Sequence, residues 1–352
     1  MKRGWQAGAK VLAGLFVTAM YAMPQANTMS ARPGVINYIE GNAAMDGRPL
    51  TLDNGQQPTI LNTNDTLSTT AGKAEVLLTP GVFLRIGDDA QVRMVSPSLT
   101  NTEVELTHGE AMLEVDQLVK DNRIVVLDDG DSITIKKPGL YKFMADSPAT
   151  AAVIDGKAEV TAGDKKLDLG KGHETALGGV LKEQNFDRKR EDDLYAWSNV
   201  RSEYDAAASY QAAKNVYVNN YYNGGFWGGW GPGWYWDGGF DSWAWLPYDG
   251  AFFSPFGWGF YGPGYIPYAP VVFVNGWRGR HVVPVNPRAP GVAAATRSVA
   301  ANQLARAQAA RSFAASGFRG GSGAHIAAGR VSGFGGGGFH GGGGFHGGGG
   351  HR

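Results

Sequence analysis

Residues 102–115 read TEVELTHGEAMLEV, and their alternating side chains decide the fold class. Val104 and Leu106 lie on one side of the chain, and Met112 or Leu113 continues that side to Val115. A period of two residues is typical of a half-buried β-strand. This stretch therefore predicts strand structure with one apolar side turned toward a core.

Similar short runs fill the chain from 34 to 182 and are separated by turn residues. The runs cover 34–41, 74–79, 82–87, 90–95, 123–127, 132–137, 140–145, 150–162 and 165–169. The turns are Asp46-Gly47, Asn54-Gly55, Pro80-Gly81, Asp129-Gly130, Pro138-Gly139 and Ala162-Gly163-Asp164. Evenly spaced short strands with such turns indicate a sandwich or roll of antiparallel strands. We therefore expect an all-β domain over 34–182, which is long enough to bury one substantial core.

A helical period follows over 187–214. Apolar side chains recur three or four residues apart and form one stripe, while charged side chains take the other face. The stripe consists of Leu194, Trp197, Val200 or Arg201, Tyr204 and Ala208, and the charged face of Arg188, Lys189, Glu191, Asp192 and Glu203. This pattern predicts one amphipathic helix that leaves the β domain.

The segment 215–283 is rich in aromatic residues, Gly and Pro, and residues 240–268 read FDSWAWLPYDGAFFSPFGWGFYGPGYIPY. Rings packed on the helix and on one another, rings stacked on sugars and rings anchored at a membrane interface all agree with this composition. Because Asp and Pro recur, no run reaches the ~20 apolar residues of a membrane span. The candidates for contact with a partner are Trp227, Trp230, Trp234, Trp236, Trp243, Trp245 and Trp258.

The last segment, 284–352, is basic, begins with an Ala/Arg stretch and ends in GGGGFHGGGGFHGGGGHR. A chain this rich in Gly does not offset the entropy lost on ordering, so we expect it to be largely disordered. All 32 acidic residues lie in 1–249 beside 23 basic ones, whereas 250–352 hold nine Arg and no acid. This asymmetry favours contact of the tail with the front of the chain, or with an anionic polymer or lipid.

Residues 1–26 have the pattern of an export signal. Basic residues precede the apolar run 11–23, which at 13 residues is short for a membrane span. Cleavage after Ala26 and retention as an anchor both stay open, because Pro24 fits the small-residue rule for cleavage poorly. The sequence has no Cys, which excludes disulfides and lipoprotein attachment. We expect an exported protein of the periplasm or cell surface.

The sequence offers no recognised catalytic motif. The spacings of a serine-hydrolase elbow, a zinc protease helix and a phosphate-binding loop do not occur. The acidic turn 128–132 lacks the spacing of a Ca²⁺ loop, and His108, His173 and His281 are scattered. The tail residues His340, His346 and His351 are candidates for weak binding of Zn²⁺ or Ni²⁺. We therefore predict a protein that is not an enzyme and needs no cofactor.

Residues 34–172 resemble the FecR-type periplasmic domain, a family named from an iron-citrate transport regulator. The likeness rests on VINYIEGNA (35–43), on NDTLSTTAGKAEVLLTPGVFLRIGDDAQVRM (64–94), and on the later AAVIDGKAEV and LDLGKGHE. Asn64 stands where the family pattern has Gly. DDLYAWSNVRSEYDAAA (192–208) and PYDGAFFSPFGWGFYGPG (247–264) resemble the C-terminal extension of a stand-alone, exported subgroup.

The resemblance implies an envelope-located β domain without known chemistry. The regulator itself carries a cytoplasmic anti-sigma segment before its membrane span. About ten residues precede the apolar run here, so we expect no such segment.

Together these patterns predict a non-catalytic interaction or structural protein of the cell envelope. An envelope sensor or regulator of the anti-sigma type, implied by the resemblance, is the alternative. A glycan- or polymer-binding module that acts through the aromatic block is a second alternative. We expect the partner to be an envelope protein or a surface polysaccharide, with self-association as a further option. Export argues against nucleic acid as the partner.

Overall fold

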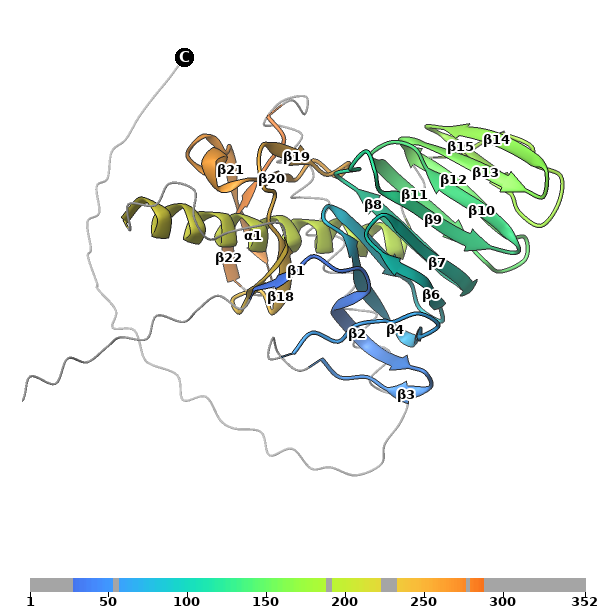
Figure 1. Ribbon diagram of the computed structural model, residues 1–352, viewed down its shortest axis with the longest axis horizontal. Coiled ribbons are helices and arrows are strands. Elements are labelled where there is room, and N and C mark those ends of the chain that lie inside the picture. The colour runs from blue at the N-terminus through green and yellow to red at the C-terminus, as the bar shows by residue number, and fades with distance from the viewer. Residues whose placement is uncertain (1–27, 53–56, 188–191, 223–232, 277–278, 288–352) are drawn as a thin grey trace, which may run out of the picture.

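The computed structural model of the chain describes residues 28–52, 57–187, 192–222, 233–276 and 279–287 (Figure 1). Within these ranges the chain is mostly β-strand with one long helix, which confirms the predicted all-β fold class. The predicted signal segment 1–26 and the tail from 288 onward lie outside the described residues.

Fifteen strands of the described part, β2 to β16, belong to one curled sheet (Figure 1). Its path runs β14-β13-β10-β9-β7-β6-β4-β5-β8-β11-β12-β15-β16, and β2 pairs with both β3 and β4. Neighbouring strands are antiparallel, as predicted, except that β7 runs parallel to β9. The strands are β2 (Val35–Met45), β3 (Arg48–Pro49), β4 (Thr66–Thr79), β5 (Val82–Ile86), β6 (Gln91–Ser98), β7 (Asn101–His108), β8 (Glu110–Val115), β9 (Arg123–Asp128), β10 (Asp131–Ile135), β11 (Gly139–Met144), β12 (Thr150–Asp155), β13 (Lys157–Ala162), β14 (Lys165–Gly170), β15 (His173–Ala176) and β16 (Gln184–Asn185).

Two of the predicted turns show why the hairpins close where they do. Asp129 and Gly130 link β9 to β10 with φ of +48° and +80°, the backbone of a two-residue hairpin turn for which Asp-Gly is well suited. Pro80 and Gly81 link β4 to β5, and Gly81 has a φ of +77°. A Cβ on Gly81 would lie 3.0 Å from the ring of Trp245, so this turn also fixes a close contact with the aromatic segment.

Both faces of the central strands are buried. Val76 of β4 and Leu84 of β5 enter a first core, which is built from one face of nearly all the strands of the sheet. Leu77 and Phe83, one residue away and on the opposite face, enter a second core with side chains of the helix and the aromatic segment. The β domain therefore contributes to two cores rather than to one.

Helix α1 (Asp193–Tyr222) lies against this second face. Asp192 caps its start, because the carboxylate accepts a hydrogen bond from the backbone N–H of Tyr195 at 2.8 Å. Asp193 forms an ion pair with Lys73 of β4 at 2.7 Å, and Trp197 donates from its indole to Glu40 of β2 at 2.9 Å. These contacts fix the first turns of the helix on the sheet.

The sequence predicted an amphipathic helix, but the middle of α1 has no face turned to solvent. Residues 201–209 are all buried, and Glu203, which the sequence pattern placed on a solvent face, is fully buried with its carboxylate 3.1 Å from His281. The reason is that later strands cover the side that would otherwise face water. Arg188, Lys189 and Glu191 lie outside the described residues.

The aromatic segment folds around α1 (Figure 1). Its rings pack in the second core: Phe260 lies 5.2 Å from Trp245 and 5.8 Å from Phe83 of the β domain, measured between ring centroids. Of the three alternatives for this segment, packing on the helix and on other rings is therefore the one that most of its described rings adopt. Its elements are β17 (Gly233–Asp237), β18 (Ser242–Trp245), β19 (Ala251–Phe253), β20 (Gly259–Tyr261), the 3₁₀-helix η1 (Pro263–Tyr268), β21 (Val271–Gly276) and β22 (Gly279–Pro284), and β1 (Thr28–Ser30) pairs with β17.

The β9–β10 hairpin generates a prediction about pH. Asp128 is 1% exposed, and neither of its carboxylate oxygens has a hydrogen-bond partner among the described residues. Burial, reinforced by Asp129 and Asp131, raises its pKa from 3.8 to about 7. Between these two values the folded state binds more protons than the unfolded chain, so this group makes the protein less stable as the pH rises.

We expect Asp128→Asn to remove this pH dependence. The free energy of unfolding of the variant, minus that of the natural chain, should increase from pH 4.5 to pH 7.5 when measured by urea denaturation. Asp164→Asn, in the exposed turn between β13 and β14, is the control and should leave the pH profile unchanged. Parallel profiles for Asp128→Asn and the natural chain would contradict the prediction.

Candidate functional site

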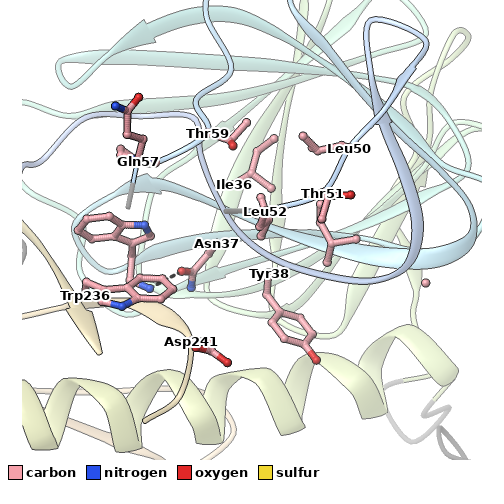
Figure 2. A pocket seen from close by; sticks show the side chains of 14 residues that line it. Ile36, Asn37, Tyr38, Leu50, Thr51, Leu52, Gln57, Thr59, Trp236 and Asp241 are labelled. Carbon is pink, nitrogen blue, oxygen red and sulfur yellow. Dashed lines mark hydrogen bonds between the residues drawn. The ribbon is translucent and has the colours of Figure 1, made fainter. Parts of the chain in front are cut away.

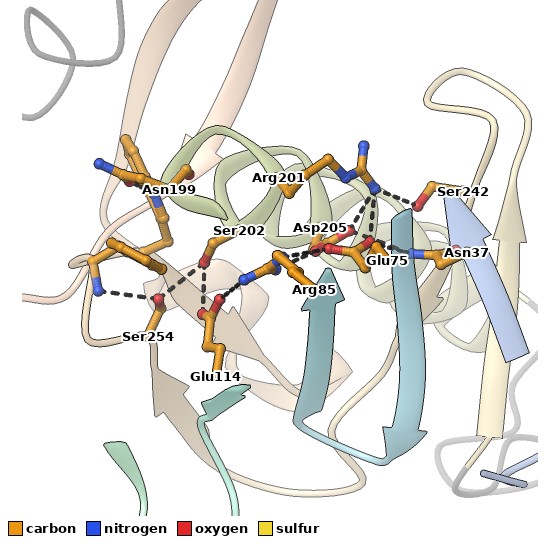
Figure 3. A network of polar contacts seen from close by, with 12 residues as sticks. Asn37, Glu75, Arg85, Glu114, Asn199, Arg201, Ser202, Asp205, Ser242 and Ser254 are labelled. Atoms are coloured by element: carbon orange, nitrogen blue, oxygen red, sulfur yellow. Dashed lines mark hydrogen bonds and ion pairs between the residues drawn. The ribbon is translucent and has the colours of Figure 1, made fainter. Parts of the chain in front are cut away.

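A network of buried charges joins the sheet to the helix (Figure 3). Arg85 of β5 is fully buried, and each of its three guanidinium nitrogens binds a different carboxylate. Nε lies 2.7 Å from Glu75 of β4, one terminal nitrogen contacts Glu114 of β8, and the other lies 2.9 Å from Asp205 of α1. Three elements that are far apart in sequence are thus fixed around one cation.

A second buried cation, Arg201 of α1, extends the network. Its Nη2 lies 2.9 Å from Glu75 and 3.0 Å from Asp205, and its guanidinium lies 4.1 Å from the centre of the Tyr38 ring. This placement adds a cation–π contact to the two ion pairs. The helix and β2 are therefore linked through the same charge cluster.

Uncharged side chains complete the network toward the aromatic segment. Ser202 donates to Glu114 at 2.7 Å, and its oxygen lies 2.9 Å from that of Ser254. At the other end, Asn37 donates to Glu75 at 2.8 Å and accepts from the backbone N–H of Trp243 at 2.7 Å. Figure 3 shows Arg85 between these two ends.

The electrostatics of the network follow from its burial. Burial acts to raise the pKa of Glu75, but Arg201 and Arg85 overcome it and hold that pKa well below its ordinary value. For nearby Asp116, burial and the neighbouring Glu114 raise the pKa well above the ordinary value. The cluster is closed to solvent, and its geometry is that of a structural anchor.

An open pocket lies beside the network, between β2, residues 50–52 and 57–59, and the β17–β18 hairpin (Figure 2). It has a volume of about 310 Å³. Trp236 and Gln57 lie at one end and Leu50 and Thr51 at the other (Figure 2). Its wall consists of Ile36, Asn37, Tyr38, Ile39, Gly41, Leu50, Thr51, Leu52, Gln57, Pro58, Thr59, Trp236, Asp241 and Trp243. We call this pocket the aromatic groove.

Two indoles and a phenol give the aromatic groove flat apolar surfaces. Trp236 and Trp243 are a cross-strand pair of the β17–β18 hairpin, with ring centroids 5.5 Å apart and ring planes at 62°. Trp243 is 5% exposed, whereas Trp236 is only partly buried. Asn37 belongs both to the wall of the groove and to the charge network. The groove thus combines apolar faces with amide, hydroxyl and carboxylate groups on a rigid base.

The structure separates the predicted Trp candidates. Trp234, Trp245 and Trp258 are at most 2% exposed, so in this structure they pack in the second core rather than on a surface for a partner. Trp236 and Trp243 both line the aromatic groove, and of these Trp243 is also buried in the second core. Trp227 and Trp230 lie outside the described residues.

The histidines of the described part form ion pairs or hydrogen bonds with acids rather than a shared site. His108 lies 2.8 Å from Asp146, and His173 lies 3.2 Å from Glu183. Among the residues that the structure describes, no group of three or more His, Asp or Glu is arranged to hold a metal ion. The tail candidates His340, His346 and His351 lie outside these residues. Within the same ranges, no helix has the length and apolarity to cross a membrane.

The sequence analysis missed the charge network. The sequence feature that could have indicated the network is a single charged residue inside a short apolar run. Arg85 is such a residue in VFLRI, and Glu114 is another in AMLEV. Such a charge lies on the strand face opposite to the first core, where solvent is the ordinary expectation. The local pattern does not reveal the later segment that covers this face, in which Ser202 lies 88 residues after Glu114 and Asp205 lies 120 residues after Arg85.

Comparisons with known proteins give a limited likeness. No family model and no curated protein matches the chain. Two crystal structures of a putative anti-sigma factor from Parabacteroides distasonis are similar to part of it, at 18% and 17% identity and a TM-score of 0.33. Each match covers 38% of this chain and 64% of the other, so this chain spans less than two thirds of that protein's length. A likeness at this TM-score bears neither on the activity nor on the partners of this chain, and the FecR-type resemblance stays a prediction from its motifs.

The charge network generates a stability prediction. Arg85→Met leaves Glu75 and Glu114 buried without their shared cation, which should cost about 3–5 kcal/mol in the free energy of unfolding. Arg93→Met is the matched control, because the Arg93–Glu105 pair is about one-third exposed and should contribute less than about 1 kcal/mol. Urea denaturation followed by circular dichroism measures both. Equal losses for the two variants would show that the network is not an anchor.

Proposed function

We propose that this chain is a non-catalytic, exported binding module that holds a saccharide of the cell envelope in the aromatic groove. The observation that carries the proposal is the pairing of Trp236 and Trp243 at a pocket that also presents Asn37 and Asp241. Flat rings contact the CH faces of a sugar, and polar groups at the rim contact its hydroxyls.

The volume of the groove agrees with a small ligand. Ligand pockets in proteins span about 300–1,000 Å³, and 310 Å³ suits a short saccharide segment. The alternation of apolar and polar groups along the wall favours a ligand that is itself amphipathic over a purely apolar one. Thr51, Gln57 and Thr59 add hydroxyl and amide groups to the same wall.

The rigidity of the groove also favours binding. Asn37 accepts from the backbone of Trp243 and donates to Glu75, and Arg201 lies against the Tyr38 ring. Groups fixed in this way lose little conformational entropy when a ligand binds. The buried network therefore supports a binding function of the open groove beside it.

The test is co-sedimentation of the purified chain with peptidoglycan sacculi and, separately, with isolated surface polysaccharide. Trp236→Ala removes the more exposed ring of the pair and should weaken binding about 2- to 10-fold, because one aromatic contact contributes ~0.5–1.5 kcal/mol. Trp fluorescence of the natural chain should also change on binding.

Tyr268→Ala is the matched control, because Tyr268 is an aromatic residue that is 82% exposed and does not line the groove. It should leave saccharide binding unchanged. Thermal unfolding of both variants must match the natural chain, so that lost binding is not lost folding. The proposal fails if neither glycan retains the chain, or if both variants bind as the natural chain does.

A further inference from the structure

The described part of the aromatic segment buries most of its rings but exposes one group of large apolar side chains. Five of the nine exposed large apolar residues of the described chain lie between 248 and 273. They are Tyr248 at 60%, Tyr265 at 41%, Tyr268 at 82%, Val271 at 38% and Phe273 at 61%. Such a concentration on a soluble surface marks a contact site.

Four of these side chains form two local pairs on neighbouring elements, and Tyr248 precedes Asp249, which is hydrogen-bonded to Tyr265. Tyr265 and Tyr268 are three residues apart on η1, and side chains at this spacing eclipse in a 3₁₀-helix. Val271 and Phe273 are two residues apart on β21 and share its outward face, with only two residues between η1 and this strand. In Figure 1, β21 lies at the end of the molecule remote from β13 and β14. We call this group the apolar edge.

The charge around the apolar edge is positive toward the end of the chain. Arg280 of β22 lies 4.5 Å from the centre of the Phe273 ring, so a cation is held on the exposed aromatic surface. The last acidic residue is Asp249, which pairs with Tyr265, and residues 250–352 contain nine Arg and no acid. The chain leaves β22 at Pro284 and continues with seven of these Arg from 288 onward.

We propose that the apolar edge docks on the surface of an anionic lipid membrane. Tyr and Phe at the edge enter the boundary between headgroups and acyl chains, where aromatic side chains are favoured. Arg280 contacts the anionic headgroups, and the absence of acids after Asp249 leaves this part of the sequence with a net positive charge. None of the five residues of the apolar edge lines the aromatic groove.

The test uses the chain without residues 1–26, which retains every described residue, and vesicles of phosphatidylglycerol and phosphatidylethanolamine. The double variant Tyr268→Ser/Phe273→Ser should lower the vesicle partition coefficient at least tenfold, because two large side chains no longer bury apolar area. Arg280→Gln should weaken binding less, and more strongly at low salt than at high salt. Vesicles of phosphatidylcholine alone should bind the natural chain more weakly.

Val180→Ser is the control, since Val180 is 79% exposed but lies in the β domain, away from the apolar edge. It should bind vesicles as the natural chain does. The proposal is overturned if the natural chain does not bind the anionic vesicles, or if the double variant binds them equally well. A different result would also overturn it: the natural chain forms a concentration-dependent dimer and does not bind vesicles, and the double variant no longer dimerises. The apolar edge would then be an interface between two copies of the chain. Saccharide binding by the double variant is measured separately, so that failure of the membrane proposal can be distinguished from failure of the proposed saccharide site.

Discussion

Arg85 carries a full charge where water does not reach it, and the arrangement of the rest of the molecule depends on that charge. Its guanidinium nitrogens bind carboxylates from β4, β8 and α1. Removing a partner would leave a buried charge uncompensated, which costs far more than a surface ion pair contributes. The helix therefore has one favourable position on the sheet, the one that brings Asp205 to Arg85.

This constraint makes the sheet, the helix and the aromatic segment one packed unit. Leu77 and Phe83 share the face of the sheet that carries Glu75 and Arg85, and without the later segment that face would expose both apolar rows and charges. The change of sequence pattern near residue 182 marks a change of secondary structure. It does not mark a gap in packing, because the second core contains residues from both sides of it.

Local features of this fold could be predicted from sequence, because short-range chemistry determines them. Asp129-Gly130 closes a hairpin for reasons that lie within two residues, and the alternation around Val104 and Leu106 identifies the face that enters the first core. The burial of Glu203 could not be predicted in the same way. Helical periodicity shows which face of a helix is polar. It does not reveal that β22 will cover that polar face and place His281 against Glu203.

The aromatic groove shows the same limit at the level of the site. Composition identified Trp236 and Trp243 as candidates along with five other Trp, and it could not divide them, since each stands among Gly and other aromatic residues. What divides them is position along the hairpin: Trp234 and Trp236 share a face with their partners Trp245 and Trp243, but the pair 234/245 is fully buried, whereas Trp236 at the other end is only partly buried.

The β17–β18 ladder sets this register, and a polar contact ties the hairpin to the charge network. The backbone N–H of Trp243 donates to Asn37, whose amide also binds Glu75 of the charge network. The buried Trp243, against which the more exposed Trp236 packs, is thus held by the charge network. Because Asn37 and Tyr38 belong both to the wall of the groove and to the contacts of the buried network, the network is the physical reason that the groove has a defined shape.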